Sequence, residues 1–123
     1  ASATTTSIQL LPGTSPVNVP IVNVDPSFFG RKMSSRMIEM GTQSGAGVAF
    51  AWCVENTGSV TLRIRADSTI DASQVAAHLC AVTGATGGGH KGAAAVHFLS
   101  LLAFASAIPL NNARITKPIP PRM

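Results

Sequence analysis

Three stretches of the chain alternate polar with apolar residues, or large with small apolar residues, with a period of two, which predicts three β-strands. Val17–Val24 is the first, although Pro20 in its interior favours an edge position or a bulge. Gly47–Glu55 and Ser59–Ala66 are the other two, and the short turn between them is typical of a hairpin. Both faces of Gly47–Glu55 are uncharged, which indicates a central strand.

Two stretches repeat their apolar residues every three or four positions, which predicts amphipathic helices. Phe28–Met40 carries Phe and Met residues on one side and mainly basic residues between them, and Gly41 is expected to end this helix. The basic residues are expected to line a solvated outer face. A second helix runs through about Val82, with Asp71 or Ser73 as its cap.

Three consecutive glycines stand before a run of good helix formers, which predicts a loop that ends just before a short helix. Backbone N–H groups at such a junction favour anions, phosphate above all. A lysine adds positive charge there, and a histidine adds a donor that titrates near neutral pH. We therefore predict a phosphate cradle within Gly84–Gly92, formed by Gly87, Gly88, Gly89, His90 and Lys91.

Arg63 and Arg65 are two residues apart on the strand Ser59–Ala66 and therefore project from the same side of the sheet. Two guanidinium groups on one face can form an anion site. The residues alone equally fit two arginines at the surface, or an ion pair with a carboxylate.

The chain resembles the DHH-associated C-terminal domain of DHH-family phosphoesterases. Gly87–Ala95 is similar to the Gly-Gly-Gly-His-x-x-Ala-Ala-Gly signature of that family, with alanine in place of the last glycine. Val60–Arg65 is similar to the family's Ser-Leu-Arg-Ser strand, with isoleucine at the second serine, and Asp71–Ala76 is similar to its Asp-x-Ser-x-Ile-Ala helix start. The resemblance extends from about Val19 to about Leu99.

In this family, which includes oligoribonucleases that also dephosphorylate pAp and single-strand-specific exonucleases, the glycine–histidine loop holds a terminal phosphate or nucleotide. The resemblance implies that Gly88 and Gly89 supply N–H donors, His90 a hydrogen bond and Arg63 positive charge. Lys91 matches a variable position and adds only general attraction. The residues after Ala95 fit either a continued helix or a strand at 96–99, and the resemblance favours the strand.

DHH phosphoesterases hydrolyse phosphate esters with two divalent metal ions, usually manganese, which are held by a separate amino-terminal domain. Two-metal hydrolysis needs several carboxylates that converge within a few ångströms. The five acidic residues here are scattered and match none of that domain's metal motifs: Asp25, Glu39, Glu55, Asp67 and Asp71. We expect no cofactor in this chain and no hydrolysis by it alone, so manganese is implied only for an absent catalytic domain. No third ligand accompanies His90 and His97 at zinc spacing.

Three functional hypotheses follow. The first is a binding module for a nucleotide or a short single-stranded nucleic acid, which resembles the substrate-holding half of a DHH phosphoesterase. The second is a structural or assembly subunit that has lost its ligand. The third is catalysis in trans, in which the chain completes the cleft of a separate metal-bearing domain. A role like that of the related domain in alanyl-tRNA synthetases ranks lower, because the glycine motif there differs.

The length predicts one small domain. The predicted strands and helices, together with the strand that the resemblance favours, predict an α/β fold with a mixed sheet of about four to five strands covered by two to three helices. We divide the chain into a flexible arm (1–16), the domain (17–110) and a proline-rich tail (111–123). Only 11% of the residues are charged, which suits a surface covered by a catalytic domain, an assembly partner or a second copy of the chain. The net charge of +4 suits a polyanionic ligand.

Gly92–Leu110 is the only segment apolar enough to suggest a membrane span, and its polar residues and proline argue against one. The small, polar start of the chain does not resemble a secretory signal. We expect a soluble intracellular protein of the cytoplasm or an organelle matrix, which is not secreted. Cys53 and Cys80 are expected to be free, buried thiols.

Overall fold

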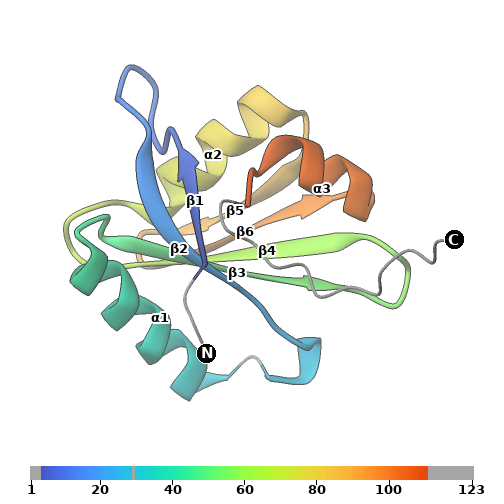
Figure 1. Ribbon diagram of the computed structural model, residues 1–123, viewed down its shortest axis with the longest axis horizontal. Helices are drawn as coiled ribbons and strands as arrows, with labels where there is room; N and C mark the ends of the chain where they lie inside the picture. The colour runs from blue at the N-terminus through green and yellow to red at the C-terminus, as the bar shows by residue number, and fades with distance from the viewer. Residues whose placement is uncertain (1–3, 29, 111–123) are drawn as a thin grey trace, which may run out of the picture.

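The structure, a computed structural model, describes residues 4–28 and 30–110. It confirms an α/β domain with a mixed sheet, and its described residues form six strands and three α-helices (Figure 1). The elements in chain order are β1 (Thr4–Ile8), β2 (Val17–Asn23), the 3-10 turn η1 (Pro26–Phe28), α1 (Arg31–Ser44), β3 (Val48–Val54), β4 (Val60–Ala66), α2 (Ala72–Thr83), β5 (Thr86–His90), β6 (Ala93–Phe98) and α3 (Leu101–Ala107). The predicted tail, 111–123, lies outside the described residues.

The strands lie in the order β1-β2-β3-β4-β6-β5. Only β2 and β3 pair in parallel, and α1 provides the crossover that such a pair requires. All other neighbours are antiparallel. After α2 the chain forms the outer strand β5 first and then turns back, so that β6 lies between β4 and β5.

The amino-terminal segment differs from the predicted arm, because Thr4–Ile8 pairs with β2 as an edge strand. The prediction that Pro20 places its strand at an edge is therefore wrong. β2 pairs with β3 only from Ile21 onward, so the proline lies just outside that ladder. Its missing N–H costs no bond to β3, which lets a central strand accept a proline.

The first helix does not end at Gly41. It continues to Ser44, and Gly45 caps it in the left-handed conformation by donating its N–H to the Thr42 carbonyl at 3.1 Å. Gly41 is buried, and a Cβ atom there would lie 2.7 Å from the backbone nitrogen of Val48. The absence of a side chain therefore serves close contact between α1 and the start of β3 rather than helix termination.

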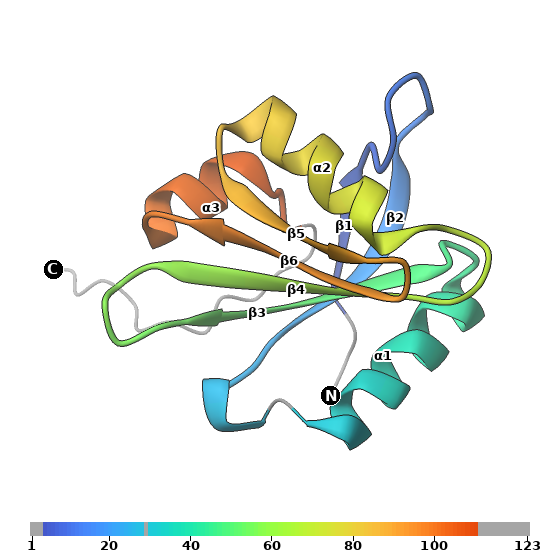
Figure 2. The same ribbon diagram turned by 180° about the vertical axis from the view of Figure 1, so that it is seen from behind.

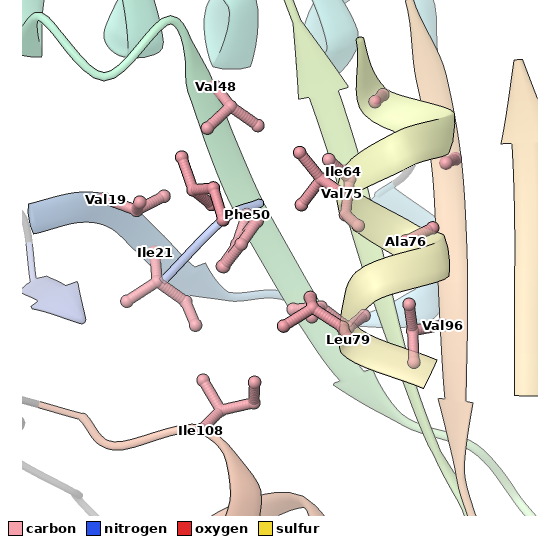
Figure 3. Packing of buried hydrophobic residues seen from close by; sticks show 14 of the residues in the cluster. Val19, Ile21, Val48, Phe50, Ile64, Val75, Ala76, Leu79, Val96 and Ile108 are labelled. Carbon is pink, nitrogen blue, oxygen red and sulfur yellow. The ribbon is translucent and has the colours of Figure 1, made fainter. Parts of the chain in front are cut away.

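The main core lies between the sheet and the helices α2 and α3. Val75, Ala76 and Leu79 point from α2 toward the sheet, where Phe50 and Ile64 are fully buried (Figure 3). This packing confirms that the alternate large residues of β3 and β4 share one face.

The helix α3 packs through its single buried side chain. Phe104 lies 4.8 Å from the Trp52 ring and 5.4 Å from the Phe98 ring, measured between ring centroids. Tilted and edge-to-face pairs at these distances add stability beyond buried area. These contacts place the aromatic rings of this region in the core.

The opposite face of the sheet carries α1 alone among the described α-helices, as both views of the fold show (Figures 1 and 2). Met37 packs on Ala49 and Ala51, with Met33 and Met40 beside it. Because α1 covers β2, β3 and part of β4, none of the described helices lies over the outer strands β6 and β5 on this face.

Two further expectations concern the described residues. Cys53 and Cys80 are both free; Cys53 is buried, while Cys80 is partly exposed. None of the described helices is long and apolar enough to span a membrane.

Candidate anion-binding site

The three glycines lie in a strand, so the predicted loop before a short helix is wrong. Gly87, Gly88 and Gly89 belong to β5, Lys91 and Gly92 form a tight turn, and the alanines that follow belong to β6. The preference for a strand after Ala95 is confirmed, and this strand begins earlier, at Ala93. Pairing with β4 on one side and β5 on the other outweighs the helix propensity of three alanines.

The helix terminus nearest to the glycines is that of α2, and it is already capped. The Asp71 carboxylate accepts hydrogen bonds from the N–H of Ser73 at 2.9 Å and of Gln74 at 3.4 Å. The Ala72 N–H donates to the Lys91 carbonyl at 2.7 Å, which ties the β5–β6 turn to the helix. The bond from the Ser73 hydroxyl lowers the Asp71 pKa most, and the charge of Lys91 lowers it further. A helix-terminus cradle is therefore not available to a ligand here.

Gly87 and Gly89 allow β5 to approach β6 closely. A Cβ atom on Gly87 would overlap the backbone of Ala95, and one on Gly89 would overlap the backbone of Ala93 and Ala94. These two glycines therefore have a structural role in the hairpin, whatever they contribute to a ligand.

The register of the outer strands brings the remaining predicted residues onto the α1 side of the sheet. Residues paired across neighbouring antiparallel strands point to the same face, so β4, β6 and β5 form three rows there. We call these nine residues the open face: Arg65, Ala93 and His90 in the first row; Arg63, Ala95 and Gly88 in the second; Thr61, His97 and Thr86 in the third.

Exposure agrees with the name for every member except Thr61, which is buried. Ala93 and Ala95 are partly exposed, whereas their neighbours Ala94 and Val96 on the other side of the strand are buried. His90 is exposed as well. In the first two rows the floor of the open face is thus made of Ala and Gly, with Arg63 and Arg65 on the β4 flank and His90 on the β5 flank.

Arg65 is held in place by two hydrogen bonds. Its Nε donates to the Ser34 hydroxyl of α1 at 2.9 Å, and its Nη1 donates to the Ile64 carbonyl at 3.0 Å. Partial burial and then the nearby charge of Arg63 lower the pKa of this guanidinium, yet an arginine stays charged in proteins. Ser34 thus fixes a permanent positive charge beside the open face.

Arg63 lies in the second row, between Arg65 of the first row and Thr61 of the third. There Thr61 donates to Glu55 at 2.7 Å, and this bond is the main cause of the lowered Glu55 pKa, to which the charge of Arg63 also contributes. Burial, followed by the charge of Glu55, raises the pKa of the neighbouring Cys53 thiol. Cys53 is therefore not suited to act as a thiolate near neutral pH.

The structure brings together His90, Arg63 and Gly88 of the predicted site on one face. Lys91 lies instead in the turn, near Asp71. Sequence reasoning proposed Arg65 as part of an anion site but missed Ser34, which holds it, and it considered His97 only as a zinc ligand. Only the strand register could reveal His97, because β6 inserts between β4 and β5.

The acidic residues do not form a metal site in the part of the chain that the structure describes, where no three His, Cys, Asp or Glu residues could hold an ion. Most bind hydroxyl groups nearby: Asp25 binds Ser27, Asp67 binds Thr42 and Thr69, and Asp71 caps α2.

Neither the family models nor the curated proteins contain a match to this chain. The resemblance to the DHH-associated domain therefore stays a prediction that rests on its motifs.

Proposed function

We propose that the chain is a binding module for the phosphate groups of a nucleotide or a short single-stranded nucleic acid, and that it does not hydrolyse them alone. The observation that carries this proposal is the open face, where Arg63, Arg65 and His90 flank a floor of small residues. The position of His90 opposite the arginines also fits the role that the DHH-associated resemblance gives it.

The dimensions of the open face suit a phosphate. Arg65 and His90 lie on β4 and β5, two strand spacings apart, or about 10 Å between backbones. Both side chains are long enough to converge on an anion above Ala93, which itself takes up little room. Guanidinium and imidazolium groups donate charge-assisted hydrogen bonds to phosphate oxygens.

Binding is expected to depend on phosphate rather than on base stacking. Proteins that hold single strands without sequence preference stack bases on exposed aromatic platforms. Here Phe50, Phe98 and Phe104 are buried in the core on the other side of the sheet. The affinity should therefore be modest and should fall with rising salt concentration.

Calorimetric titration with a nucleoside monophosphate tests this proposal. His90→Ala should weaken binding by about three- to tenfold, since it removes a charge-assisted contact, and Arg63→Ala should weaken it less, since Arg63 lies one row away from the phosphate above Ala93. Lys32→Ala is the matched control, because Lys32 is an exposed cation on α1 outside the open face. If all three variants bind like the wild type, the ligand does not use the open face.

Manganese enters this proposal only through a separate DHH domain, because the scattered carboxylates of the described residues do not fit a two-metal centre. Catalysis in trans would need such a domain to be added. Failure of the mixture to hydrolyse short oligonucleotides with manganese would count against that version.

The assembly hypothesis has one observation in its favour. Leu99 and Leu102 are 92% and 77% exposed where β6 leads into α3. Large exposed apolar side chains in one region are typical of surfaces that bind another protein. Sedimentation equilibrium of the wild type and of a Leu99→Ser, Leu102→Ser variant would test self-association. A wild type that remains monomeric at high concentration would remove the homo-oligomer from consideration.

A further inference from the structure

A polar chain of three residues ends at the third row of the open face. The Thr61 hydroxyl donates to Glu55 Oε2 at 2.7 Å, and the same hydroxyl oxygen lies 3.3 Å from His97 Nδ1. Thr61 is buried, with 4% of its surface exposed, while His97 is exposed. Thr61 therefore orients the imidazole from the side of the sheet, and the rest of the ring faces solvent.

This chain of bonds decides which nitrogen of His97 carries the proton. A threonine hydroxyl has one hydrogen to donate. Thr61 donates it to the Glu55 carboxylate, because an ionised carboxylate can only accept hydrogen bonds. Thr61 can then only accept from His97, so Nδ1 must be the protonated nitrogen of the neutral ring. Nε2 is left to accept a hydrogen bond in the neutral form and to donate one in the imidazolium form.

The three rows of the open face are evenly spaced along the strands. Arg65 marks the first row, Arg63 the second and His97 the third, and adjacent rows are two residues, or about 6.7 Å, apart. That step is comparable to the separation of successive phosphates in an extended single strand. Each of the three rows therefore offers a cationic donor at the position of one phosphate.

We propose that His97 is a further phosphate contact, so that the open face binds three successive phosphates of a short single-stranded oligonucleotide rather than one phosphate of a mononucleotide. This inference rests on the proposed function and adds the length of its ligand. The Nε2–H of the imidazolium donates to the third phosphate, while Thr61 and Glu55 hold the ring.

The charged and titratable groups that face His97 are Glu55 and Arg63, with the protonated Cys53 thiol behind them. The Glu55 carboxylate lies beyond the Thr61 hydroxyl, and Arg63 lies in the adjacent row. Glu55 is bonded on the Nδ1 side of the ring, so it does not block the other nitrogen.

The test compares dissociation constants for a 5′-phosphorylated mononucleotide and a 5′-phosphorylated trinucleotide in the wild type and two variants. His97→Ala should weaken trinucleotide binding about three- to fivefold and leave mononucleotide binding unchanged. Thr61→Val keeps the shape of a buried β-branched residue but removes the hydroxyl that orients His97. It should therefore lower the ratio of the mononucleotide to the trinucleotide dissociation constant.

The pH dependence supplies a readout that a structural role of His97 would not change. The mononucleotide-to-trinucleotide ratio of dissociation constants should be larger at pH 6 than at pH 8 in the wild type, since only the imidazolium donates through Nε2. Groups that act on the terminal phosphate act on it in both ligands, so their pH dependence cancels in the ratio. In His97→Ala the ratio should be smaller and independent of pH.

Two outcomes would overturn the inference in different ways. If the wild type binds the mononucleotide and His97→Ala leaves the trinucleotide unchanged, the third contact does not exist but the proposed function stands. If neither ligand binds the wild type, the proposed function fails, and this inference fails with it.

Discussion

Single side chains decide how charge is presented on the open face. Ser34 of α1 binds the Nε of Arg65, although the two residues are 31 positions apart. Gly87 and Gly89 have no side chain where β5 meets β6, which lets His90 reach the same row as Arg65. The site therefore depends as much on residues that place the cations as on the cations themselves.

Ser34→Ala should weaken phosphate binding without unfolding the protein. Arg65 would keep its charge but lose the hydrogen bond that orders its side chain, so the mononucleotide affinity should fall about two- to fivefold. Ser35→Ala is the matched control, because Ser35 is the exposed neighbour on the same helix turn. Equal affinities of the two variants would show that the bond from Ser34 does not position Arg65 for the ligand.

Gly89→Ala should destabilise the fold by about 1–3 kcal/mol, because the added methyl group overlaps the backbone of β6. Gly92→Ala, two residues beyond His90, provides a control, because a Cβ atom there has nothing within 4 Å. Urea denaturation of both variants checks the difference. A Gly89→Ala protein as stable as Gly92→Ala would mean that the hairpin is less closely packed than described.

At the scale of elements, the sequence pattern predicts the interior better than the edges. The alternation of large and small apolar residues in β3 arises because both faces of this central strand are largely buried. The alternation of apolar and polar residues in β4 arises because only one of its faces is fully buried, and both strands formed as predicted. Thr4–Ile8 has few apolar residues, because an edge strand buries little. Its sequence therefore predicts a flexible arm rather than a strand.

The sequence predicts a helix start where the β5–β6 hairpin forms, and the physical reason for this difference is another one. Helix propensity depends only on the local sequence, and alanine favours a helix unless tertiary contacts favour another structure. Pairing of β6 between two strands is a long-range interaction that no local pattern contains. The shared face of Arg63 and Arg65 could therefore be predicted from period two, whereas the position of His90 and His97 opposite them could not.

The Asp71 cap gives α2 a stability that depends on pH. Hydrogen bonds to the carboxylate lower its pKa in the folded state, so its contribution is full above the unfolded pKa of about 3.9 and is lost as pH falls through the lower folded value. Asp71→Ala should therefore lower the melting temperature at pH 6 much more than at pH 2.5.

Thermal unfolding followed by circular dichroism checks the cap, with Ser68→Ala in the same connection as the control. A melting-temperature difference between wild type and Asp71→Ala that stays constant down to pH 2.5 would contradict a role for the ionised carboxylate. The turn at Lys91 should loosen together with the cap, because Ala72 holds its carbonyl.

At the scale of the whole molecule, the two faces of the sheet differ in what they carry. The α2 and α3 side holds the aromatic and aliphatic core, whereas on the α1 side no described helix covers the outer strands (Figures 1 and 2). The net charge of +4 attracts anions to the molecule as a whole. Under the proposed function, the arginine and histidine rows are where the anion binds.

An amide-resolved NMR titration with a nucleoside monophosphate, at low and moderate salt and beside His90→Ala, tests the central claim most directly. We predict shifts centred on Gly87–Lys91 and on Arg63, which weaken at the higher salt concentration and largely vanish in the variant. A silent open face at millimolar ligand, or shifts confined to Lys32 and Arg36 on the outside of α1, would contradict the claim and favour an assembly role.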